Sequence, residues 1–276
     1  MSYRHLTYAE ISALEAQACT AEEWSRVMVA EGFLADNIHN ARFSGDVRLG
    51  VFDREFTLDG GLKRVAGVRH ATLHNVVVGD NCSIDNVHNY IANYTIGHDT
   101  LIENVDLILV DSHSSFGNGV AVNVLNETGG REVYISDKLS AHMAYIMAMY
   151  RHRPRIVELS TAWADEIAES RRSSIGYVGK RSRIIGVRFI REMNIGDDVV
   201  IEGASLLENG TLLNSVRIGM DVKCRDFIAV EGASIEMGVI VVRSFIGEGV
   251  KLGNSFTAVD SLFFANSHCE HGEACS

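Results

Sequence analysis

A six-residue repeat is the feature of this sequence that most restricts how it can fold. Four of the five blocks in Val78–Leu107 open with a branched aliphatic residue followed by Gly, Asp or Glu; the openers are Val78, Ile84, Tyr90, Ile96 and Ile102. This period matches neither the alternation of an amphipathic strand nor the spacing of a helix. It predicts short strands joined by sharp turns, with one inward anchor on each of three sides of a coil.

The repeat returns after an interruption. Nine further blocks open at Ile195, Ile201, Leu207, Ile218, Cys224, Val230, Ile246, Leu252 and Phe264. Such repetition is typical of a solenoid, in which each coil is stabilised mainly by its neighbours. Ordinary β-structure with chance periodicity is the alternative, and it explains so many aligned blocks less well.

These blocks resemble the hexapeptide repeat of left-handed parallel β-helix proteins. The expected fold class is therefore mainly β: a left-handed parallel β-helix with N-terminal helices and an inserted helical hairpin. The loop that begins at Asp111 and the terminal stretch LFFANSHCEHGEAC also resemble a poorly characterised family of larger bacterial β-helix proteins that contain a domain of unknown function. That resemblance covers essentially the whole chain and implies a fold but little established chemistry.

Four segments are expected along the chain. They are an N-terminal helical cap (1–36), a first β-helix section (37–136) with an irregular loop (111–131), an inserted helical hairpin (137–174) and a second β-helix section (175–276). In the cap, Thr7 and Thr20 each precede a Glu by three residues, which is the capping-box spacing. The repeat stops at residue 276 without a polar cap, so we expect either a fragment of a longer chain or an element or subunit that covers the last coil.

The hairpin is predicted from two apolar stripes on either side of Pro154. The first helix is expected to start at Asp137 or Ser140, with Met143, Ile146, Met147 and Tyr150 facing inward. In the second helix, Leu159, Trp163 and Ile167 share one face. Trp163 is therefore expected to be largely buried, so that Trp163→Ala would cost roughly 3–5 kcal/mol.

Charge and composition exclude several function classes. The net charge of −11 argues against general nucleic-acid binding. Residues 151–191 contain ten Lys/Arg and four Asp/Glu, a local balance of +6, so this segment either attracts an anionic ligand or is a solvated basic face. No signal peptide or apolar span is visible, and the five Cys show no CxxC spacing. We expect a cytoplasmic protein without nucleic-acid or membrane partners.

The hexapeptide superfamily that these blocks resemble consists largely of acyl- and acetyltransferases. The resemblance implies a homotrimer, a small-molecule substrate such as a sugar or nucleotide sugar, and an acyl-CoA or acyl carrier thioester as donor, with no bound cofactor. A His would act as general base and a backbone N–H would stabilise the oxyanion. The rival hypothesis is a non-catalytic scaffold or ligand-binding β-helix, since a fold alone does not determine function.

Residues about eighteen apart should stack on adjacent coils if three hexads close one coil. This places His70, His88 and Asp106 in one column, where an acid can orient a catalytic His; the alternative is a polar corner column. The same spacing stacks Asp80 on His98, Asn75 on Asn93 and Asp111, and Asn86 on Asn104. The stacked Asn residues are expected to be structural ladders.

The irregular loop supplies the favoured catalytic candidate, His113, because loops that leave a rigid scaffold often carry function. The residues expected to bind ligand are Asp111, Ser114, Asn118, Asn126, Glu127, Arg131, Arg151 and Arg153. A last cluster, His268, Cys269, His271 and Cys275, has residue types that suit zinc. Its spacing matches no zinc finger, and no metal site is predicted there.

Overall fold

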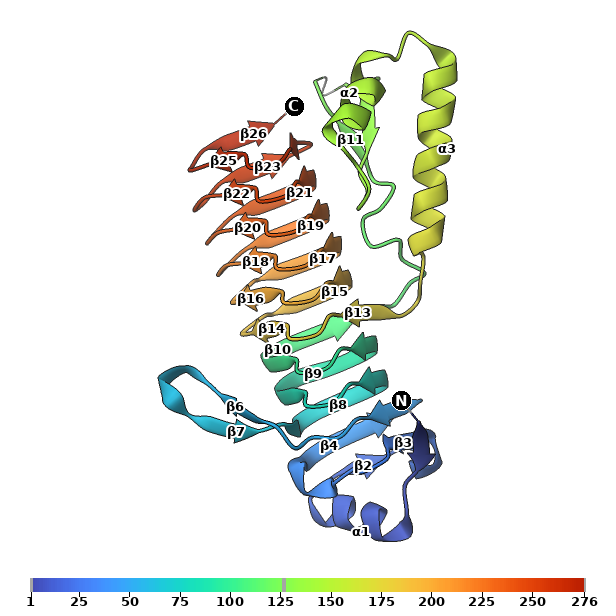
Figure 1. Cartoon of the computed structure of the whole chain (residues 1–276), viewed down its shortest axis with the longest axis vertical. Helices are drawn as coiled ribbons and strands as arrows, with labels where there is room; N and C mark the ends of the chain where they lie inside the picture. The colour runs from blue at the N-terminus through green and yellow to red at the C-terminus, as the bar shows by residue number, and fades with distance from the viewer. Residues whose placement is uncertain (1, 126–127, 276) are drawn as a thin grey trace.

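The computed structural model describes residues 2–125 and 128–275 as a tall column of stacked coils, with a helical hairpin beside its C-terminal part (Figure 1). Strands that lie above one another in the column pair in parallel, and among the described strands of this sheet β1 (Tyr3–His5) makes the one antiparallel pairing, with β3 (Val27–Ala30). The chain is therefore mainly β, with few helices, as the sequence predicts.

The pairings sort the strands onto three faces, which we call A, B and C in the order in which the chain crosses them. Face A contains β14 (Arg183–Ile185), β16 (Val200–Glu202), β18 (Arg217–Ile218), β20 (Ser234–Ile235), β22 (Lys251–Leu252) and β25 (His268–Cys269). Face B contains β2 (Thr20–Ala21), β23 (Thr257–Val259) and β26 (Glu273–Cys275). Face C contains β1, β3, β5 (Val47–Leu49), β13 (Gly176–Val178) and β24 (Leu262–Phe263).

Longer strands turn a corner between faces. They are β4 (Ile38–Ser44), β8 (Gly67–Val78), β9 (Ser83–Ile96), β10 (Leu101–Leu109), β15 (Phe189–Ile195), β17 (Leu206–Leu212), β19 (Lys223–Ala229) and β21 (Ile240–Ile246). Two antiparallel ribbons lie outside the column, β6 (Glu55–Thr57) with β7 (Lys63–Val65) and β11 (Ala121–Asn123) with β12 (Glu132–Tyr134). The short helices are η1 (Trp24–Arg26), η2 (Ala35–Asn37) and η3 (Asp59–Gly61).

The coils of the second half contain seventeen residues rather than the predicted eighteen. Ile201 pairs with Ile218, and Ile218 pairs with Ile235. The buried anchors follow steps of six, five and six residues; one full set is Ile201, Leu207, Leu212 and Ile218. The step across the corner between faces B and C is the short one, because a single residue with positive φ, such as Asn209, turns the chain there inside one strand.

Uneven steps shift the predicted register at three blocks: a five-residue step precedes Ala229 and Phe263, and a seven-residue step leads from Ile84 to Ile91. Ile91, Ala229 and Phe263 face the column interior, in place of the predicted Tyr90, Val230 and Phe264. Val230 and Phe264 instead pack outside the column against the insertion. A one-residue slip exchanges inward and outward side chains because a strand alternates with a period of two.

Residues in the left-handed region form the corners. Asn and Asp adopt this conformation more readily than other non-glycine residues, which explains why they recur in the blocks. The corner positions include Asn75, Asn81, Asn86, Asn93, Asp99, Asn104, Asp198, Asn209 and Asp226.

The first 36 residues are not a purely helical cap, so that prediction was wrong in part. The capping box is confirmed: Thr7 caps α1 (Tyr8–Ala16), and Glu10 bonds back to the Thr7 N–H. Thr20, however, lies in β2 and pairs with Arg42, so the second predicted helix is absent from the described structure. The alternation of buried residues in β3 lets this segment join the sheet instead of forming a helix.

Replacing Glu10 by Gln is expected to lower the free energy of unfolding at pH 7 by about 1–2 kcal/mol. The Arg4 guanidinium, together with the Thr7 N–H and hydroxyl, lowers the Glu10 pKa from 4.5 to about 2. Because the folded-state pKa is depressed, this stabilisation is present above pH 4.5 and is lost as the pH falls towards 2. Melting temperatures of the two proteins should therefore converge on acidification. Glu23→Gln is the matched control, and a gap independent of pH would contradict the assignment.

The insertion leaves and re-enters the column at the corner between faces B and C. Ser114 and Ser173 exchange two backbone hydrogen bonds at its neck, of 3.0 and 2.9 Å. Above the neck, the ribbon β11–β12 and the helices α2 (Ala141–Met149) and α3 (Pro154–Arg171) pack on outward side chains of successive coils, including Ile228 and Phe245. The hairpin therefore has a second small core, which it shares with the column.

The faces of the hairpin helices differ from the prediction. Ser140 does cap α2, and Met147 is buried, but Ile146 and Tyr150 are exposed. In α3 the buried residues are Ala164 and Ala168; Leu159 is 53% exposed, and Trp163 is half-buried beside it. The expected burial of Trp163 is therefore confirmed in part, because its side chain packs against the second small core, while Ala164 and Ala168 lie against Gly119 of the insertion. No helix among the described residues has the length and apolarity to cross a membrane.

Candidate ligand groove and its histidines

The neck of the insertion is fixed to the column by Glu192. Its carboxylate accepts hydrogen bonds from the Asp111 and Ser112 N–H groups, at 3.0 and 3.1 Å. Glu192 itself sits at a corner with positive φ. The backbone that carries His113 is thereby held beside faces B and C.

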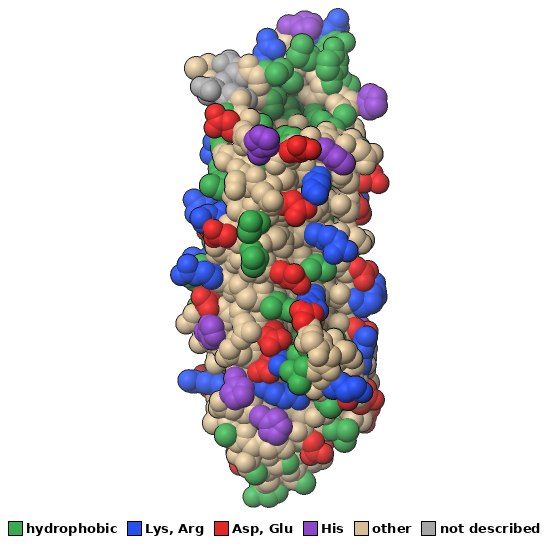
Figure 2. All heavy atoms as spheres, turned by 90° about the vertical axis from the view of Figure 1, so that its left-hand side faces the viewer, with side chains coloured by type: hydrophobic (Ala, Val, Ile, Leu, Met, Phe, Trp, Pro, Cys, Tyr) green, Lys and Arg blue, Asp and Glu red, His purple; other side chains and the backbone are tan. Residues whose placement is uncertain are grey.

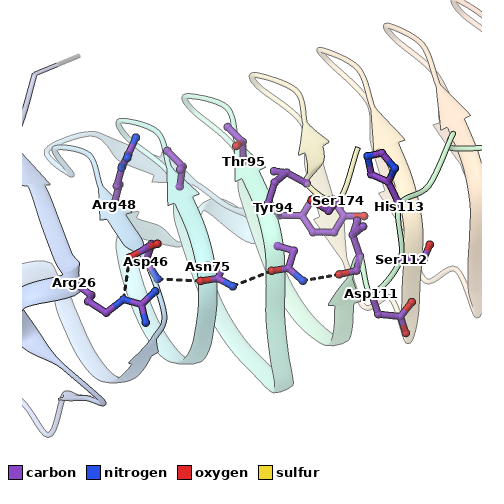
Figure 3. Close-up of a pocket in the computed structure, with 14 residues that line it drawn as sticks. Arg26, Asp46, Arg48, Asn75, Tyr94, Thr95, Asp111, Ser112, His113 and Ser174 are labelled. Carbon is purple, nitrogen blue, oxygen red and sulfur yellow. Dashed lines mark hydrogen bonds and ion pairs between the residues drawn. The ribbon is translucent and has the colours of Figure 1, made fainter. Parts of the chain in front are cut away.

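A groove of about 710 Å³ runs from this neck towards the N-terminal end of the column (Figure 3). Its lining residues come from the N-terminal coils and from both strands of the neck: Arg26, Asp46, Arg48, Asn75, Val77, Asn93, Tyr94, Thr95, Val110, Asp111, Ser112, His113, Ser174 and Ile175. The predicted residues Asp111 and His113 therefore do lie in one concave site.

A ladder of side-chain amides forms part of the groove wall. The Asp46 N–H donates to Asn75 Oδ1 at 2.9 Å, Asn75 Nδ2 donates to Asn93 Oδ1 at 3.1 Å, and Asn93 Nδ2 donates to the Val110 carbonyl at 2.6 Å. The Asn75–Asn93 stack is thus confirmed. Asp111 does not continue it, because the chain leaves the coil after Val110 and the ladder ends on a backbone oxygen.

The ladder also fixes the tautomer of His74. A backbone donor at one end and a carbonyl acceptor at the other determine the orientation of both amides, so Asn75 Nδ2 donates to His74 Nε2 at 3.0 Å. His74 Nδ1 then carries the proton and donates to Ser44 Oγ at 2.9 Å, and the Ser44 hydroxyl donates to Glu22. The polar atoms of Asn75, His74 and Ser44 thus form hydrogen bonds with one another and with Glu22. They stabilise the wall of the groove, and any ligand contact or catalysis would fall to other residues.

His113 and Arg48 are the basic side chains of the groove that remain open to a ligand, since Arg26 pairs with Asp46. Among the described residues, neither side chain makes an ion pair or a hydrogen bond, although Arg48 lies over the Tyr3 ring at 5.7 Å. His113 is exposed, as predicted. In Figure 3 the Asp111 carboxylate points away from the His113 ring, so the predicted neighbouring acid does not orient this imidazole.

Several residues predicted to bind ligand have other roles. Ser114 and Asn118 are buried; Ser114 Oγ accepts the Phe116 N–H, and the Asn118 amide bonds Ser115 and Asp137 within the insertion. These polar side chains of the loop therefore form hydrogen bonds that stabilise the insertion and are not available to a ligand. Asn126 and Glu127 lie outside the described residues.

The predicted arginines do not reach the groove. Arg151 pairs with Glu132 at 2.8 Å, and Arg131 contacts Met149. Arg153 and Arg151 precede α3, whose eighteen residues extend about 27 Å, so they lie at the far end of the hairpin from the neck.

The basic segment 151–191 is therefore not a free cationic surface. Most of its arginines are paired, for example Arg171 with Asp137, Arg181 with Asp198 and Arg183 with Glu202. On the side of the column opposite the hairpin, Figure 2 shows acidic and basic side chains interspersed. The cations of the groove are Arg26 and Arg48 instead.

A second histidine site lies on face B, apart from the neck. His88 Nδ1 bonds the Asp106 carboxylate at 2.5 Å, so this predicted His–acid pair is confirmed. His70 does not stack on His88; it lies 3.4 Å from Asp85. The reason is a register shift: Arg69 pairs with a residue sixteen positions on, and Leu73 with one eighteen positions on.

The other predicted stacks have mixed outcomes. The Asp80 N–H donates to His98 Nδ1 at 2.9 Å, and Asn86 donates to Asn104 at 2.6 Å, as the eighteen-residue spacing predicts. In the part of the chain that the structure describes, no group of three or more His, Cys, Asp or Glu side chains could hold a metal ion.

Sequence reasoning missed Arg26, Arg48, Tyr94 and Thr95 as groove residues. Arg26 belongs to a segment expected to be helical, and its place at the groove follows from the parallel pairing of β3 with β5. Arg48 pairs with Val77, and Val77 pairs with Thr95, so Arg48 and Thr95 lie two coils apart on face C. The alternation of buried and exposed residues in β3 and β5 was the available signal.

Two comparisons with known proteins match the chain. Residues 3–276 match a family described as a domain of unknown function, DUF4954. The chain is also similar to an uncharacterized protein of Treponema pallidum (strain Nichols), with 27% identity over 262 residues. That similarity covers 91% of this chain and 34% of the Treponema protein, so the chain spans about a third of that relative's length.

Proposed function

This chain belongs to the DUF4954 family, and we propose that it is a hexapeptide-repeat acyltransferase-like protein whose column is a left-handed parallel β-helix. Its substrate would be a sugar, a nucleotide sugar or another small polar acceptor, and its donor an acyl-CoA or acyl carrier thioester. The observation that carries the proposal is the free imidazole of His113 on the wall of the groove at the insertion neck.

His113 suits the role of general base in this reaction. It would take the proton from an acceptor hydroxyl or amine as that atom attacks the thioester carbonyl. The carbon–sulfur bond then breaks, and the leaving thiolate takes the proton from the imidazolium. Arg48, whose guanidinium makes no ion pair among the described residues, would bind the phosphates of an acyl-CoA donor.

A homotrimer is part of the proposal. The groove is open along the outside of a column, so a neighbouring copy could exclude water from it and complete the cleft. The rival, a non-catalytic binding protein, is favoured by one observation: the Asn75–Asn93 ladder and His74 are hydrogen-bonded among themselves, as in a structural wall.

The proposal is tested by thioester cleavage. Purified protein is incubated with acetyl-CoA and, in separate reactions, a sugar, a nucleotide sugar and an amino sugar; thiol release and acylated product are measured by absorbance and mass spectrometry. Acceptor-dependent release, with a trimeric mass by light scattering, would support the enzyme. Binding of these acceptors without release would support the rival instead.

Arg48→Gln is expected to weaken acetyl-CoA binding by roughly tenfold, because one charge-assisted contact is lost. Isothermal titration calorimetry measures this directly. Arg217→Gln is the matched control, since Arg217 is an exposed arginine on face A, far along the column from the groove. Equal affinities for all three proteins would remove Arg48 from the donor site.

A further inference from the structure

Face B of the N-terminal coils carries a second polar concave surface, separate from the groove at the neck. Two adjoining hollows, of about 550 and 430 Å³, share Thr20 and Arg42. The first is lined further by Asn40, His70, Thr72, Asn86, His88 and Asn89, and the second by Glu22 and Ser44. We propose that this surface, which we call the face B site, binds a small phosphorylated polyol such as a sugar monophosphate.

Arg42 supplies the anion-binding group. It is exposed, and among the described residues its guanidinium makes no ion pair or hydrogen bond. It lies between Thr20 and Thr72, because the strands that carry these residues pair directly. A guanidinium with a hydroxyl on either side matches the oxygens of a phosphate monoester, which accept several hydrogen bonds at once.

His88 supplies a directed donor or acceptor at the other end of the surface. Its Nδ1 is bound to the Asp106 carboxylate at 2.5 Å, so the ring is held in one orientation. Its Nε2 makes no hydrogen bond among the described residues, and the side chain is 53% exposed. A bound acid fixes the tautomer and orientation of an imidazole, which leaves Nε2 available to a ligand.

The remaining polar groups suit the hydroxyls of a polyol. Asn86 uses its Nδ2 on Asn104, which leaves its Oδ1 for a ligand hydroxyl. Asn89 adds another amide. A bare phosphate ion would use Arg42 and leave these groups unused.

The acids around the surface leave the Arg42 guanidinium without an ion pair among the described residues. Glu22 lies at its edge, with its carboxylate bonded to the Ser44 hydroxyl, and Asp106 is bonded to His88. Asp85 is bonded towards Arg64 and His70. These acids bond to groups other than Arg42, so the guanidinium remains open to a ligand, while the Glu22 carboxylate keeps its own charge at the edge of the surface.

Calorimetric titration of the full chain tests the face B site. Glucose 6-phosphate, mannose 1-phosphate, inorganic phosphate and glucose are titrated separately into the wild type, Arg42→Gln and His88→Gln. At least one sugar phosphate should bind, and both phosphate alone and glucose alone should bind at least roughly tenfold more weakly, because each makes only part of the contacts. Arg42→Gln and His88→Gln should each weaken the sugar phosphate by a similar factor.

Two controls separate this site from the groove at the neck. Arg191→Gln removes an exposed arginine of the same face, outside the face B site, and His113→Ala alters the neck; both should leave the affinity for the sugar phosphate unchanged. In an NMR titration the ring signals of His88 should shift and those of His113 should not. Absence of sugar phosphate binding, equal binding of bare phosphate, or loss of affinity in His113→Ala would each overturn the proposal, whatever the outcome of the acyltransferase assay.

Discussion

Replacing His113 by Ala is expected to lower the rate of acyl transfer by roughly 10²–10⁴-fold, the usual contribution of a general base. The melting temperature should change little, because the side chain is exposed and makes no hydrogen bond or ion pair among the described residues. Turnover is measured with the acceptor and donor identified by the thioester assay, and stability by thermal unfolding of the same preparations.

Two further histidine variants show whether the loss of acyl transfer is specific to His113. His39→Ala removes an exposed imidazole on another face and should affect neither property. His88→Ala removes the partner of Asp106 and should lower the melting temperature while leaving acyl transfer intact. If His88→Ala abolished transfer and His113→Ala did not, the base would be the His88–Asp106 pair, which already has the acid that His113 lacks.

The stacking of coils was predictable because the repeat is visible in single residues. Each coil presents a buried aliphatic anchor, such as Ile84 or Ile102, and a corner residue that tolerates positive φ, such as Asn86 or Asn104. The eighteen-residue spacing then placed Asn86 on Asn104 correctly. It failed at His70, where the coil changes length within one turn.

Such changes of coil length are hard to predict because they depend on backbone geometry at a corner rather than on composition. Each seventeen-residue coil has one step of five residues, such as those from Leu207 to Leu212 and from Cys224 to Ala229. A block that opens with Val230 fits the six-residue pattern as well as one that opens with Ala229. Packing decides between them, since Ala229 fits inside the column and Val230 contacts the insertion.

The candidate groove was predictable in part. The interruption after Val110 indicated where the chain leaves the scaffold, and this placed His113 at a concave site. The residues opposite it, Arg26 and Arg48, were missed because they come from coils with a degenerate repeat, where the short alternation in β3 and β5 is the one signal. The charge count of residues 151–191 was misleading, since it ignored the acids with which those arginines pair.

Tyr94 explains how the column tolerates the departure of the chain at this point. Its ring is fully buried, and it passes over Gly176 of the next coil, where an added Cβ would lie 2.4 Å from the ring. Its hydroxyl donates to the Met193 carbonyl at 2.9 Å and accepts the Met193 N–H at 3.2 Å. One side chain thus satisfies both backbone groups of a fully buried residue two coils along the column.

Tyr94→Ala is expected to lower the free energy of unfolding by about 3–5 kcal/mol, the usual cost of deleting a buried aromatic ring. Tyr94→Phe keeps the ring and leaves both Met193 backbone groups without their partner, so it should cost about 1–3 kcal/mol. Chemical denaturation of both variants measures these values. Tyr177→Phe is the matched control, because Tyr177 is a partly exposed tyrosine on the neighbouring strand of face C.

The ratio between the losses of unfolding free energy in the two Tyr94 variants separates the contribution of ring packing from that of the hydrogen bonds. A Phe variant as stable as the wild type would show that the Met193 groups find other partners, and that the ring alone is required. Because Tyr94 also lies beneath the groove at the neck, the Phe variant should keep its affinity for any ligand of that groove. Loss of affinity without loss of stability would mean that the phenol hydroxyl contacts ligand, which its burial under Met193 argues against.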